Sequence, residues 1–374
     1  MKKMKFTDCV DIVGSSCHKF DGTKVYVSTG AVDTDRIEPL DTEIVDYDGR
    51  PSRANLVAEE NDILFAKMQA TEKTLLIDEE LSKHIYSTGF CAVRAKDHII
   101  TNKCLYYLLT SETFLEQKDK NCSGATQKAI TNAGLKKIVI SVPDLEQQTA
   151  FVEQMDAVRN MIVYRKEQLK KLDELVKAQF IEMFGDPKTN NKEWKMNTFA
   201  DICTVRQGLQ IPISKRLTQY EEGCHEYITV AYLHGSKERE YIKNPKSTVI
   251  CTEEDVLMTR TGNTGMVITN VAGAFHNNFF LIDFDRKRYN KVFLVEYLNL
   301  DLIQAEIKKR AGTSTIPDLN HGEFYAISIY EPPIELQNQF AAFVEQVDKS
   351  KFEVQQSLEK LETLKKSLIQ QYFG

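Results

Sequence analysis

DLEQQTAFVEQMDAVRNMIVYRKEQLKKLDELVKAQFIEMFG, residues 144–185, is the stretch that decides the organisation of this chain, because it occurs twice. It aligns without gaps, at a constant offset of 189, on PIELQNQFAAFVEQVDKSKFEVQQSLEKLETLKKSLIQQYFG, residues 333–374. Eleven of the 42 aligned pairs are identical, among them Gln148 with Gln337 and Phe151 with Phe340. The offset is about half of the 374 residues, so the sequence predicts an internal duplication.

Both copies have the pattern of a long helix that packs along another helix. Apolar residues recur at spacings of three and four, and neither copy contains Gly or Pro between its opening turn and its closing Gly. Arg165, Lys351 and Lys365 interrupt the apolar seam. The predicted seam residues are Met155, Ile162, Leu169, Leu172 and Val176 in the first copy, and Val347, Val354, Leu358, Leu361 and Leu368 in the second.

Each helix is expected to be the packing partner of the other. Thirty-odd helical residues at about 1.5 Å each predict a rod of roughly 45–50 Å, and Gly185 and Gly374 have the position of helix stop signals. A surface helix lying on its own domain is the simpler alternative, but the first copy needs a long partner and only the second copy matches it. Chain order then makes the pair antiparallel and the rod a spacer.

The segments outside these helices, residues 1–143 (the first lobe) and 186–332 (the second lobe), repeat more loosely. Residues 60–69 parallel residues 253–262, which places Lys67 opposite Arg260. Short runs rich in Val, Ile, Tyr and Phe, broken by Gly, Asn and Asp, predict strands and turns, with helices near 101–119 and 292–309. The predicted fold is therefore α+β, with two tandem mixed lobes, an antiparallel coiled coil and an internal pseudo-two-fold repeat.

Composition restricts the class of protein. With 42% hydrophobic residues, the chain is long enough for two separate cores. Its eight cysteines show no CxxC and no zinc-like spacing, so we expect no metal site and a reducing, cytoplasmic environment. No stretch approaches 18 apolar residues, and MKKMKFTDCVDIV at the start lacks the apolar region of a signal peptide, so we expect neither secretion nor a membrane span.

The net charge of −6 argues against simple bulk adhesion to nucleic acid. The two lobes are nearly neutral, whereas the two helices carry three of the six excess negative charges. Two equivalent lobes about a pseudo-two-fold axis nevertheless suit duplex DNA, which is itself close to two-fold symmetric. Phosphate contacts would then come from local basic patches, although a solvated charged face is the better interpretation of any single patch.

The order of these pieces resembles the specificity (S) subunit of type I restriction–modification systems. The resemblance covers essentially the whole chain, and it rests on order and duplication, since each motif is short. The matching pieces are residues 142–148 with Phe184-Gly185, residues 331–337 with Phe373-Gly374, the strands at 62–67 and 255–260, the Gly312-Thr-Ser turn and Glu193-Trp-Lys. The first lobe departs from this pattern, with Ser123-Gly-Ala-Thr-Gln at the glycine turn and Met1-Lys-Lys-Met-Lys in place of a tryptophan-containing start.

The resemblance implies a DNA-reading subunit without chemistry of its own. Residues 1–143 and 186–332 would be target recognition domains that each read one half of a bipartite double-stranded DNA site. Helices 144–185 and 333–374 would set the gap and dock two modification (methyltransferase) subunits. S-adenosylmethionine and ATP would be bound by the modification subunits and by restriction/translocase subunits, so this chain needs no cofactor. A rod of the predicted length places the half-sites about 10 bp apart, centre to centre.

Base readout requires Arg or Lys for guanine and Asn or Gln for adenine, held on strand ends or turns. The candidates in the first lobe are Lys67, Gln69, Ser123, Thr126, Gln127 and Lys128. Those in the second lobe are Arg206, Gln207, Gln210, Arg260, Thr261, Asn263, Thr264, Thr313, Ser314 and Thr315. The stretch 260–265 carries the most weight, because its two glycines let the backbone approach a phosphate, with an ordinary turn as the alternative. Gln148 and Gln337 are predicted to cap or orient the helices.

The chain lacks several catalytic motifs. It contains no GxxxxGK[ST], no Asn-Pro-Pro-Tyr or Asp-Pro-Pro-Tyr, no GxSxG and no HExxH, so we expect a non-catalytic subunit. Three alternatives stay open. One is a structural adaptor with two ligand-binding lobes on a coiled-coil strut, and another is a cysteine-dependent hydrolase. The third is an S-like subunit of a different methyltransferase-based defence system.

Overall fold

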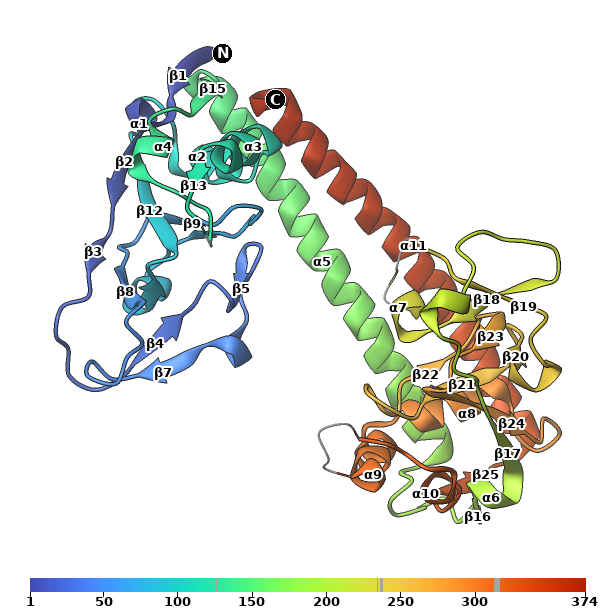
Figure 1. The fold of residues 1–374 in the computed structure, drawn as a ribbon. Coiled ribbons are helices and arrows are strands. Elements are labelled where there is room, and N and C mark those ends of the chain that lie inside the picture. Colours follow the sequence, from blue (N-terminus) through green and yellow to red (C-terminus); the bar gives the residue numbers. More distant parts are fainter. Residues whose placement is uncertain (126, 234, 236–237, 313–316) are drawn as a thin grey trace. The chain divides into compact units, whose positions relative to one another are not determined.

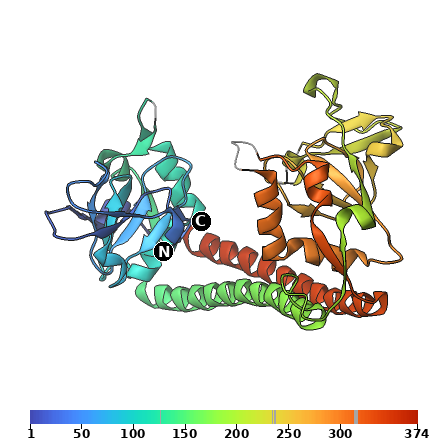
Figure 2. The ribbon, with the colours of Figure 1, turned by 90° about the horizontal axis from the view of Figure 1, so that it is seen from below.

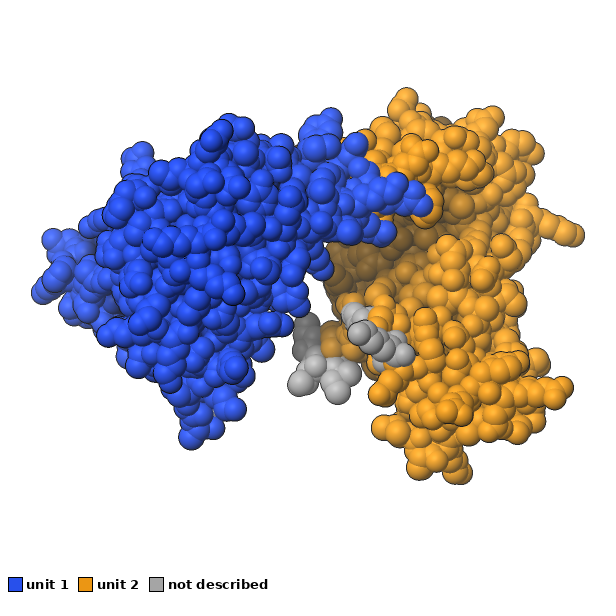
Figure 3. All heavy atoms as spheres, turned by 90° about the horizontal axis from the view of Figure 1, so that it is seen from above, with its two compact units in different colours: residues 1–166, 356–374 blue, residues 167–355 orange. Residues whose placement is uncertain are grey.

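The computed structural model describes residues 1–125, 127–233, 235, 238–312 and 317–374. These residues form two compact units (Figure 3). Unit 1 comprises Met1–Lys166 and Gln356–Gly374, and unit 2 comprises Glu167–Gln355. The division falls within two long helices, α5 (Leu145–Phe184) and α11 (Ile334–Phe373), so each unit holds one lobe and part of both helices.

The duplicated segments form continuous helices of 40 residues each, and their ribbons run side by side in both views (Figures 1 and 2). At about 1.5 Å per residue each helix measures about 60 Å. The predicted length of 45–50 Å was therefore too short, because helical structure also includes the opening and closing turns of each copy. Gly185 ends α5 as predicted, with a φ of 82° and an N–H bond of 2.8 Å to the Ile181 carbonyl.

Within each unit the two helices run antiparallel. In unit 1 the ring of Phe151, early in α5, lies 5.1 Å from the ring of Phe373, at the end of α11. In unit 2 the ring of Phe180, late in α5, lies 5.3 Å from that of Phe340, early in α11. These pairings confirm the predicted antiparallel pair.

The predicted seam is partly buried. Lys351, which interrupts it, is compensated by the Asp173 carboxylate at 2.7 Å and the Asp348 carboxylate at 3.5 Å. The Lys351 side chain is 27% exposed, so its ammonium is only partly removed from solvent and these carboxylates balance its charge. The buried seam residues are Met155, Ile162, Val176, Val347, Val354 and Leu361, whereas Leu169, Leu172, Leu358 and Leu368 are partly exposed.

The ends of both helices belong to the cores of the lobes. In unit 1, Phe151 and Phe373 pack into the same apolar cluster as Phe6. In unit 2, Phe180 stacks on Phe293 with ring centroids 5.4 Å apart. The helix ends therefore belong to the cores of the lobes as well as to the helix pair, which the sequence pattern did not indicate.

The first lobe contains two main sheets. One has the order β10-β9-β12-β2 and the other has the order β3-β8-β11-β4-β7. Three small pairs, β1 with β15, β5 with β6 and β13 with β14, complete the lobe. The strands are β1 (Lys2–Lys5), β2 (Val10–Val13), β3 (Ser15–Ser16), β4 (Lys24–Val27), β5 (Val32–Asp33), β6 (Arg36–Ile37), β7 (Glu43–Val45), β8 (Ala54–Val57), β9 (Ile63–Ala66), β10 (Thr74–Leu76), β11 (Ile85–Ser87), β12 (Phe90–Ala95), β13 (Cys122–Ser123), β14 (Ala129–Ile130) and β15 (Val139–Val142). The helices are α1 (Phe6–Cys9), α2 (Asn102–Leu109), α3 (Glu112–Lys120) and α4 (Asn132–Leu135).

The second lobe repeats the main strand order, except that among the described residues its second sheet has four strands and no counterpart of β3. Its sheets have the orders β17-β24-β21-β22 and β19-β18-β23-β20, and β16 pairs with β25 as β1 pairs with β15. The strands are β16 (Lys195–Thr198), β17 (Cys203–Gln207), β18 (Cys224–Ile228), β19 (Tyr241–Lys243), β20 (Ile250–Cys251), β21 (Val256–Thr259), β22 (Val267–Ile268), β23 (Gly273–Phe275), β24 (Phe279–Phe284) and β25 (Ser328–Glu331). The helices are α6 (Phe199–Ile202), α7 (Val230–Leu233), α8 (Lys291–Asn299), α9 (Asp301–Ala311) and α10 (His321–Tyr325). The predicted α+β repeat is confirmed.

Each single helix predicted within a lobe is in fact two helices. Residues 101–119 divide into α2 and α3 because the Ser111 side chain accepts the Phe114 N–H at 3.2 Å and so starts a new helix. Residues 292–309 divide into α8 and α9 at Leu300, whose backbone is extended. In the described ranges, no helix combines the length and apolar character that crossing a membrane requires.

Candidate nucleic-acid interface

Lys67 lies just beyond β9, where two backbone hydrogen bonds hold it in place. Its N–H donates to the Gly89 carbonyl at 2.9 Å, and its carbonyl accepts the Ile130 N–H at 2.8 Å. The next residue, Met68, forms an antiparallel bridge with Ala129. The chain after β9 is thus joined to the glycine turn between β13 and β14.

Arg260, just beyond β21, is held by the equivalent bonds. Its N–H donates to the Asn278 carbonyl at 2.7 Å, and its carbonyl accepts the Leu319 N–H at 2.9 Å. Thr261 forms the bridge with Asp318. These partners lie 189 residues after their counterparts in the first lobe, so the internal repeat extends to individual hydrogen bonds within the lobes.

In the first lobe, these contacts bring together most of the residues that the sequence predicted to contact DNA bases. The Gln69 N–H donates to the Lys128 carbonyl at 3.0 Å, and Ser123 pairs with Ala129. The side chains of Gln69, Ser123, Gln127 and Lys128 are exposed, and Lys67 is half-buried. Thr126, also selected from the sequence, lies outside the described residues.

Sequence reasoning missed the lysine that supports this loop. Lys118, at the end of α3, is 1% exposed, and its ammonium donates to the Met68 carbonyl at 3.0 Å and the Thr71 carbonyl at 2.7 Å. The adjacent Asp119 accepts the Ala70 N–H at 3.0 Å. A buried ammonium requires such partners, so Lys118 fixes the loop that follows Lys67. A lysine in a polar helix gives no sequence signal for this role.

In the second lobe, β17 and β21 both run antiparallel to β24, so their carboxyl ends meet at the edge where β24 begins. Gln207 ends β17, and Gln210 follows it on the surface. At the same edge the Asn277 amide donates to the Gln210 side-chain oxygen at 3.4 Å. Asn277 and Asn278 were not selected from the sequence, although two amides directly before an apolar strand are a detectable signal.

Arg260 is engaged within the protein. Its guanidinium donates to both carboxylate oxygens of Asp318, at 3.0 and 2.8 Å, and its side chain is 18% exposed. This bidentate geometry is the one that the guanidinium would present to a guanine edge. To read a base, the Arg260 guanidinium must either release the Asp318 carboxylate or bind the base and Asp318 at the same time.

The turn after Arg260 is held by its own side chains. The Thr264 hydroxyl is buried and lies 3.0 Å from the Arg260 carbonyl and 3.1 Å from the Pro317 carbonyl, so it closes the turn. Asn263 is exposed, and Thr261 is half-buried. Gly262 has a φ of 84° with open space around it, which leaves its backbone accessible. Thr313, Ser314 and Thr315 lie outside the described residues.

Arg206 lies within β17, apart from this turn. Its guanidinium donates to the Thr248 carbonyl at 3.3 Å, and its Nε lies 4.0 Å from the Asp283 carboxylate. The side chain is 33% exposed. It therefore faces the strand neighbours of β17, and only part of it is available to a ligand.

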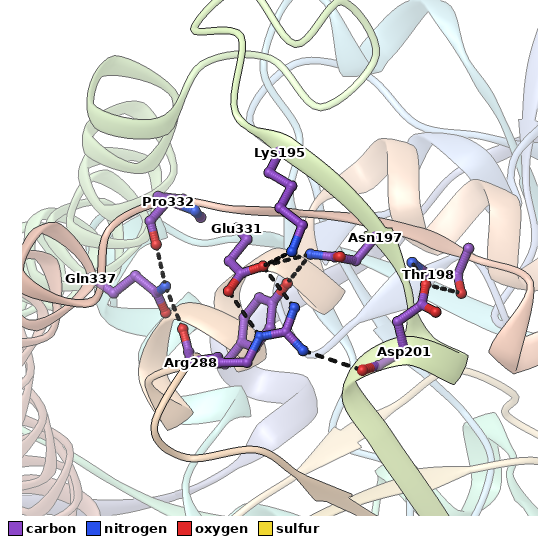
Figure 4. A network of polar contacts seen from close by, with 9 residues as sticks. Lys195, Asn197, Thr198, Asp201, Arg288, Glu331, Pro332 and Gln337 are labelled. Carbon is purple, nitrogen blue, oxygen red and sulfur yellow. Dashed lines mark hydrogen bonds and ion pairs between the residues drawn. The ribbon is translucent and has the colours of Figure 1, made fainter.

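Gln148 and Gln337 orient the long helices, as predicted. Both are fully buried. The Gln337 amide donates to the Arg288 and Pro332 carbonyls at 2.9 and 2.8 Å (Figure 4). The Gln337 side-chain oxygen accepts the Asn290 N–H at 2.8 Å. Gln148 makes the same three bonds 189 residues earlier, with Ile99, Pro143 and Thr101.

Beside Gln337 lies an ion pair (Figure 4). The Arg288 guanidinium donates to both oxygens of Glu331 at 2.8 and 2.7 Å, and the Asn197 amide adds a bond of 2.8 Å. The hydrogen bonds from Arg288 lower the pKa of Glu331 to about 2. The equivalent residues of the first lobe are Ile99 and Val142, so the two lobes join their helices with different chemistry.

The acidic, histidine and cysteine side chains were compared with the requirements of a metal site and of a reactive thiol. The described residues contain no group of three or more His, Cys, Asp or Glu side chains that could hold a metal ion. All eight cysteines are free thiols, and only Cys122 is not fully buried. Burial raises the pKa of Cys104 and of Cys203 to about 12.

The family comparison agrees with this arrangement. The model of the family described as type I restriction modification DNA specificity domain matches residues 8–174 and again residues 191–365. Each match contains one lobe and most of the helix that follows it. The chain belongs to this family.

Individual relatives are more distant. The chain is 24% identical over 183 residues to the type I restriction enzyme MjaVIII specificity subunit of Methanocaldococcus jannaschii, a match that covers 49% of this chain and 42% of that relative. The matched part is thus less than half of that relative's length. A chain from a structure of complex assembly and conformational transition in the type I R-M system superposes with a TM-score of 0.61 at 20% identity, covering 99% of this chain and 97% of its own. The S subunit of M. genitalium superposes with a TM-score of 0.57 at 15% identity, covering 100% and 96%.

Proposed function

We propose that this chain is the DNA-recognition subunit of a type I restriction–modification complex. Each lobe, residues 1–143 and 186–332, reads one half of a bipartite double-stranded site, and the helix pair, residues 144–185 and 333–374, sets the gap. The chain carries no cofactor and catalyses no reaction. Modification subunits that dock on the helix pair bind S-adenosylmethionine, and restriction/translocase subunits bind ATP.

The observation that carries this proposal is the repeat at the strand ends. Lys67 and Arg260 have the same backbone hydrogen bonds, but their side chains and the turns around them differ. A repeated frame with different side chains is what two lobes need to present two different half-sites in the same way. Because the side chains differ between the two lobes, we expect the two half-sites of the DNA target to differ in sequence.

The cysteine-dependent hydrolase is the weakest alternative. A thiol acts as a nucleophile in its deprotonated form, and burial opposes deprotonation of Cys104 and Cys203 at neutral pH. The adaptor, and an S-like subunit in another methyltransferase-based defence system, are separated from the proposal by experiment.

The test is adenine-methylation mapping by long-read sequencing. Cells express the neighbouring modification subunit with or without this chain. We expect a bipartite methylated motif that appears only with the chain. An assembled complex that produces no new motif would favour the adaptor.

A second arm tests the spacer. Seven residues are inserted in α5 after Lys166 and seven in α11 after Gln355, which preserves the heptad phase of both helices. The insertion adds about 10 Å at about 1.5 Å per residue, so the gap should lengthen by roughly three base pairs. The half-sites themselves should not change, because neither lobe is altered.

A further inference from the structure

One surface of the first lobe is unlike the rest of the chain in charge. Residues 33–48 contain seven acidic residues and one arginine. The whole chain has 48 basic and 54 acidic residues, so the remainder carries 47 of each sign. These sixteen residues, which include β5, β6 and β7, thus carry a net charge of −6, and the charges of the remainder sum to zero.

The charge is exposed and only partly compensated. Asp33, Asp41, Glu43, Asp46 and Asp48 are exposed. Arg36 pairs with Glu38 at 2.7 Å, and Arg159 with Asp35 at 3.3 Å. Within the described residues, the side chains of Asp41, Glu43 and Asp48 have no hydrogen-bond or ion-pair partner. A DNA-binding role for this surface is disfavoured, since phosphates would be repelled.

The same segment exposes two large apolar side chains. Leu40, in the turn Pro39–Asp41, is 99% exposed, and Ile44, in β7, is 77% exposed. Isolated surface apolar residues are common, but these two lie four residues apart within the most acidic part of the chain. An apolar anchor with a charged surround is the usual composition of a protein-binding surface.

β7 is also the edge strand of its sheet. It pairs with β4 on one side, and within the described residues nothing pairs with its other side. In Figure 1, β4 and β7 lie at the opposite end of unit 1 from β1 and β15. An open edge strand is a template for an additional strand.

The equivalent strand of the second lobe differs in both respects. β19 is covered, because the Leu217 and Tyr241 backbones exchange hydrogen bonds of 3.0 and 2.8 Å. The segment that contains it, residues 229–249, has four basic and two acidic residues. The open acidic edge is thus a feature of the first lobe, and the shared fold does not require it.

We propose that β7 and Leu40 form a docking edge that takes a basic, extended segment of a protein partner as an additional strand. The partner's Lys or Arg residues would face Asp41 and Glu43, and an apolar residue would cover Ile44. A second copy of this chain does not fit, since pairing two β7 strands would oppose their acidic residues. The proposal goes beyond DNA recognition, and only the second test below, which uses the modification and restriction subunits, rests on the proposed function.

The first test uses the whole chain and two synthetic decapeptides. One alternates lysine with valine, and the other has glutamate in place of lysine. With the lysine peptide, hydrogen–deuterium exchange should slow at residues 41–46. The double variant Asp41→Asn/Glu43→Gln, which keeps the β7 backbone, should weaken binding about tenfold. Glu222→Gln, which removes the charge of an exposed acidic residue in unit 2, is the control and should not change it.

Three results would overturn the proposal. They are equal binding of the glutamate peptide, protection confined to segments other than 41–46, and no protection at millimolar lysine peptide while the chain is folded. None of them depends on methylation mapping, so failure of this proposal is distinguishable from failure of the proposed function.

The second test identifies the natural occupant. A photoreactive benzoylphenylalanine replaces Leu40 in the chain co-expressed with its modification and restriction subunits. We expect a cross-link to a Lys- or Arg-rich segment of one of these subunits, and unchanged methylated half-sites in the Asp41→Asn/Glu43→Gln variant. A cross-link to a second copy of the chain or to an acidic segment would refute the assignment, as would the absence of any cross-link in the assembled complex.

Discussion

Gln337 offers the sharpest test of how the lobes are joined to their helices. Gln337→Met keeps the volume of the side chain and removes three hydrogen bonds, which leaves the Arg288 and Pro332 carbonyls and the Asn290 N–H without this partner. At about 1 kcal/mol for each unsatisfied group, the free energy of unfolding of unit 2 should fall by about 3 kcal/mol. With a urea m-value of about 2 kcal/mol/M, the midpoint should drop by roughly 1.5 M.

The assay is specific to unit 2, because the chain contains a single tryptophan. The indole N–H of Trp194 donates to the Phe184 carbonyl at 2.8 Å, so its fluorescence reports the end of α5 in unit 2. Gln148→Met, in unit 1, should leave the Trp194 transition unchanged while destabilising unit 1, as measured by circular dichroism.

Gln339→Met is the matched control for this measurement. Gln339 lies two residues further along α11 and is exposed, so its substitution should change stability by less than about 0.5 kcal/mol. If Gln337→Met shifted the Trp194 midpoint no more than Gln339→Met, the three hydrogen bonds would not stabilise the junction, and the argument would fail.

Three further predictions concern charge, DNA and thiols. Because the pKa of Glu331 is lowered to about 2, its contribution to the unfolding free energy is full above pH 4.5 and is lost as the pH falls towards 2. After solvent screening this contribution should amount to about 1–2 kcal/mol. Glu331→Gln should remove this pH dependence of the Trp194 transition. Arg260→Ala should cost about 1–3 kcal/mol of DNA binding at one half-site in a filter or anisotropy assay of the assembled complex, whereas Asp318→Asn, which frees the guanidinium, should increase affinity for unrelated DNA; no effect of either would exclude Arg260 as a contact. Ellman's reagent should modify Cys122 first in the native chain and the other seven thiols only on unfolding, and rapid reaction of several thiols would contradict the buried positions.

The long helices could be predicted because their signal is local. The spacing of Met155, Ile162 and Val176 defines a helical face without reference to the rest of the fold, and the duplicated copy identifies the partner. The burial of the helix ends in the lobes could not be predicted, since the contacts of Phe151 and Phe180 depend on aromatic side chains from distant parts of each lobe. The break at Leu300 was missed because the apolar pattern continues through it, whereas the polar run 110–113 around Ser111 was a local signal that the predicted helix 101–119 passed over.

The candidate interface was only partly predictable for a similar reason. Strand ends and glycine turns can be recognised from the sequence, and these located Lys67 and Arg260. The partners of those residues come from tertiary structure. Asp318 engages Arg260 from 58 positions away, and Lys118 supports the loop after Lys67 from about 50 positions away. Asn277 became a candidate only when antiparallel pairing placed the start of β24 beside the ends of β17 and β21.

The two halves of the chain share their buried junction residues but differ in the side chains of their turns. Where they agree, as in Gln148 with Gln337 and Phe151 with Phe340, the residues are buried and join helix to lobe. Where they differ, as in Lys67 with Arg260, the backbone bonds persist and the side chains change. A substitution at a junction affects stability whatever the ligand, whereas a substitution on a turn that keeps its backbone bonds changes only what the lobe presents. This separation lets one scaffold present two unrelated surfaces, and we propose that the specificity of the chain lies in the turns that follow β9 and β21.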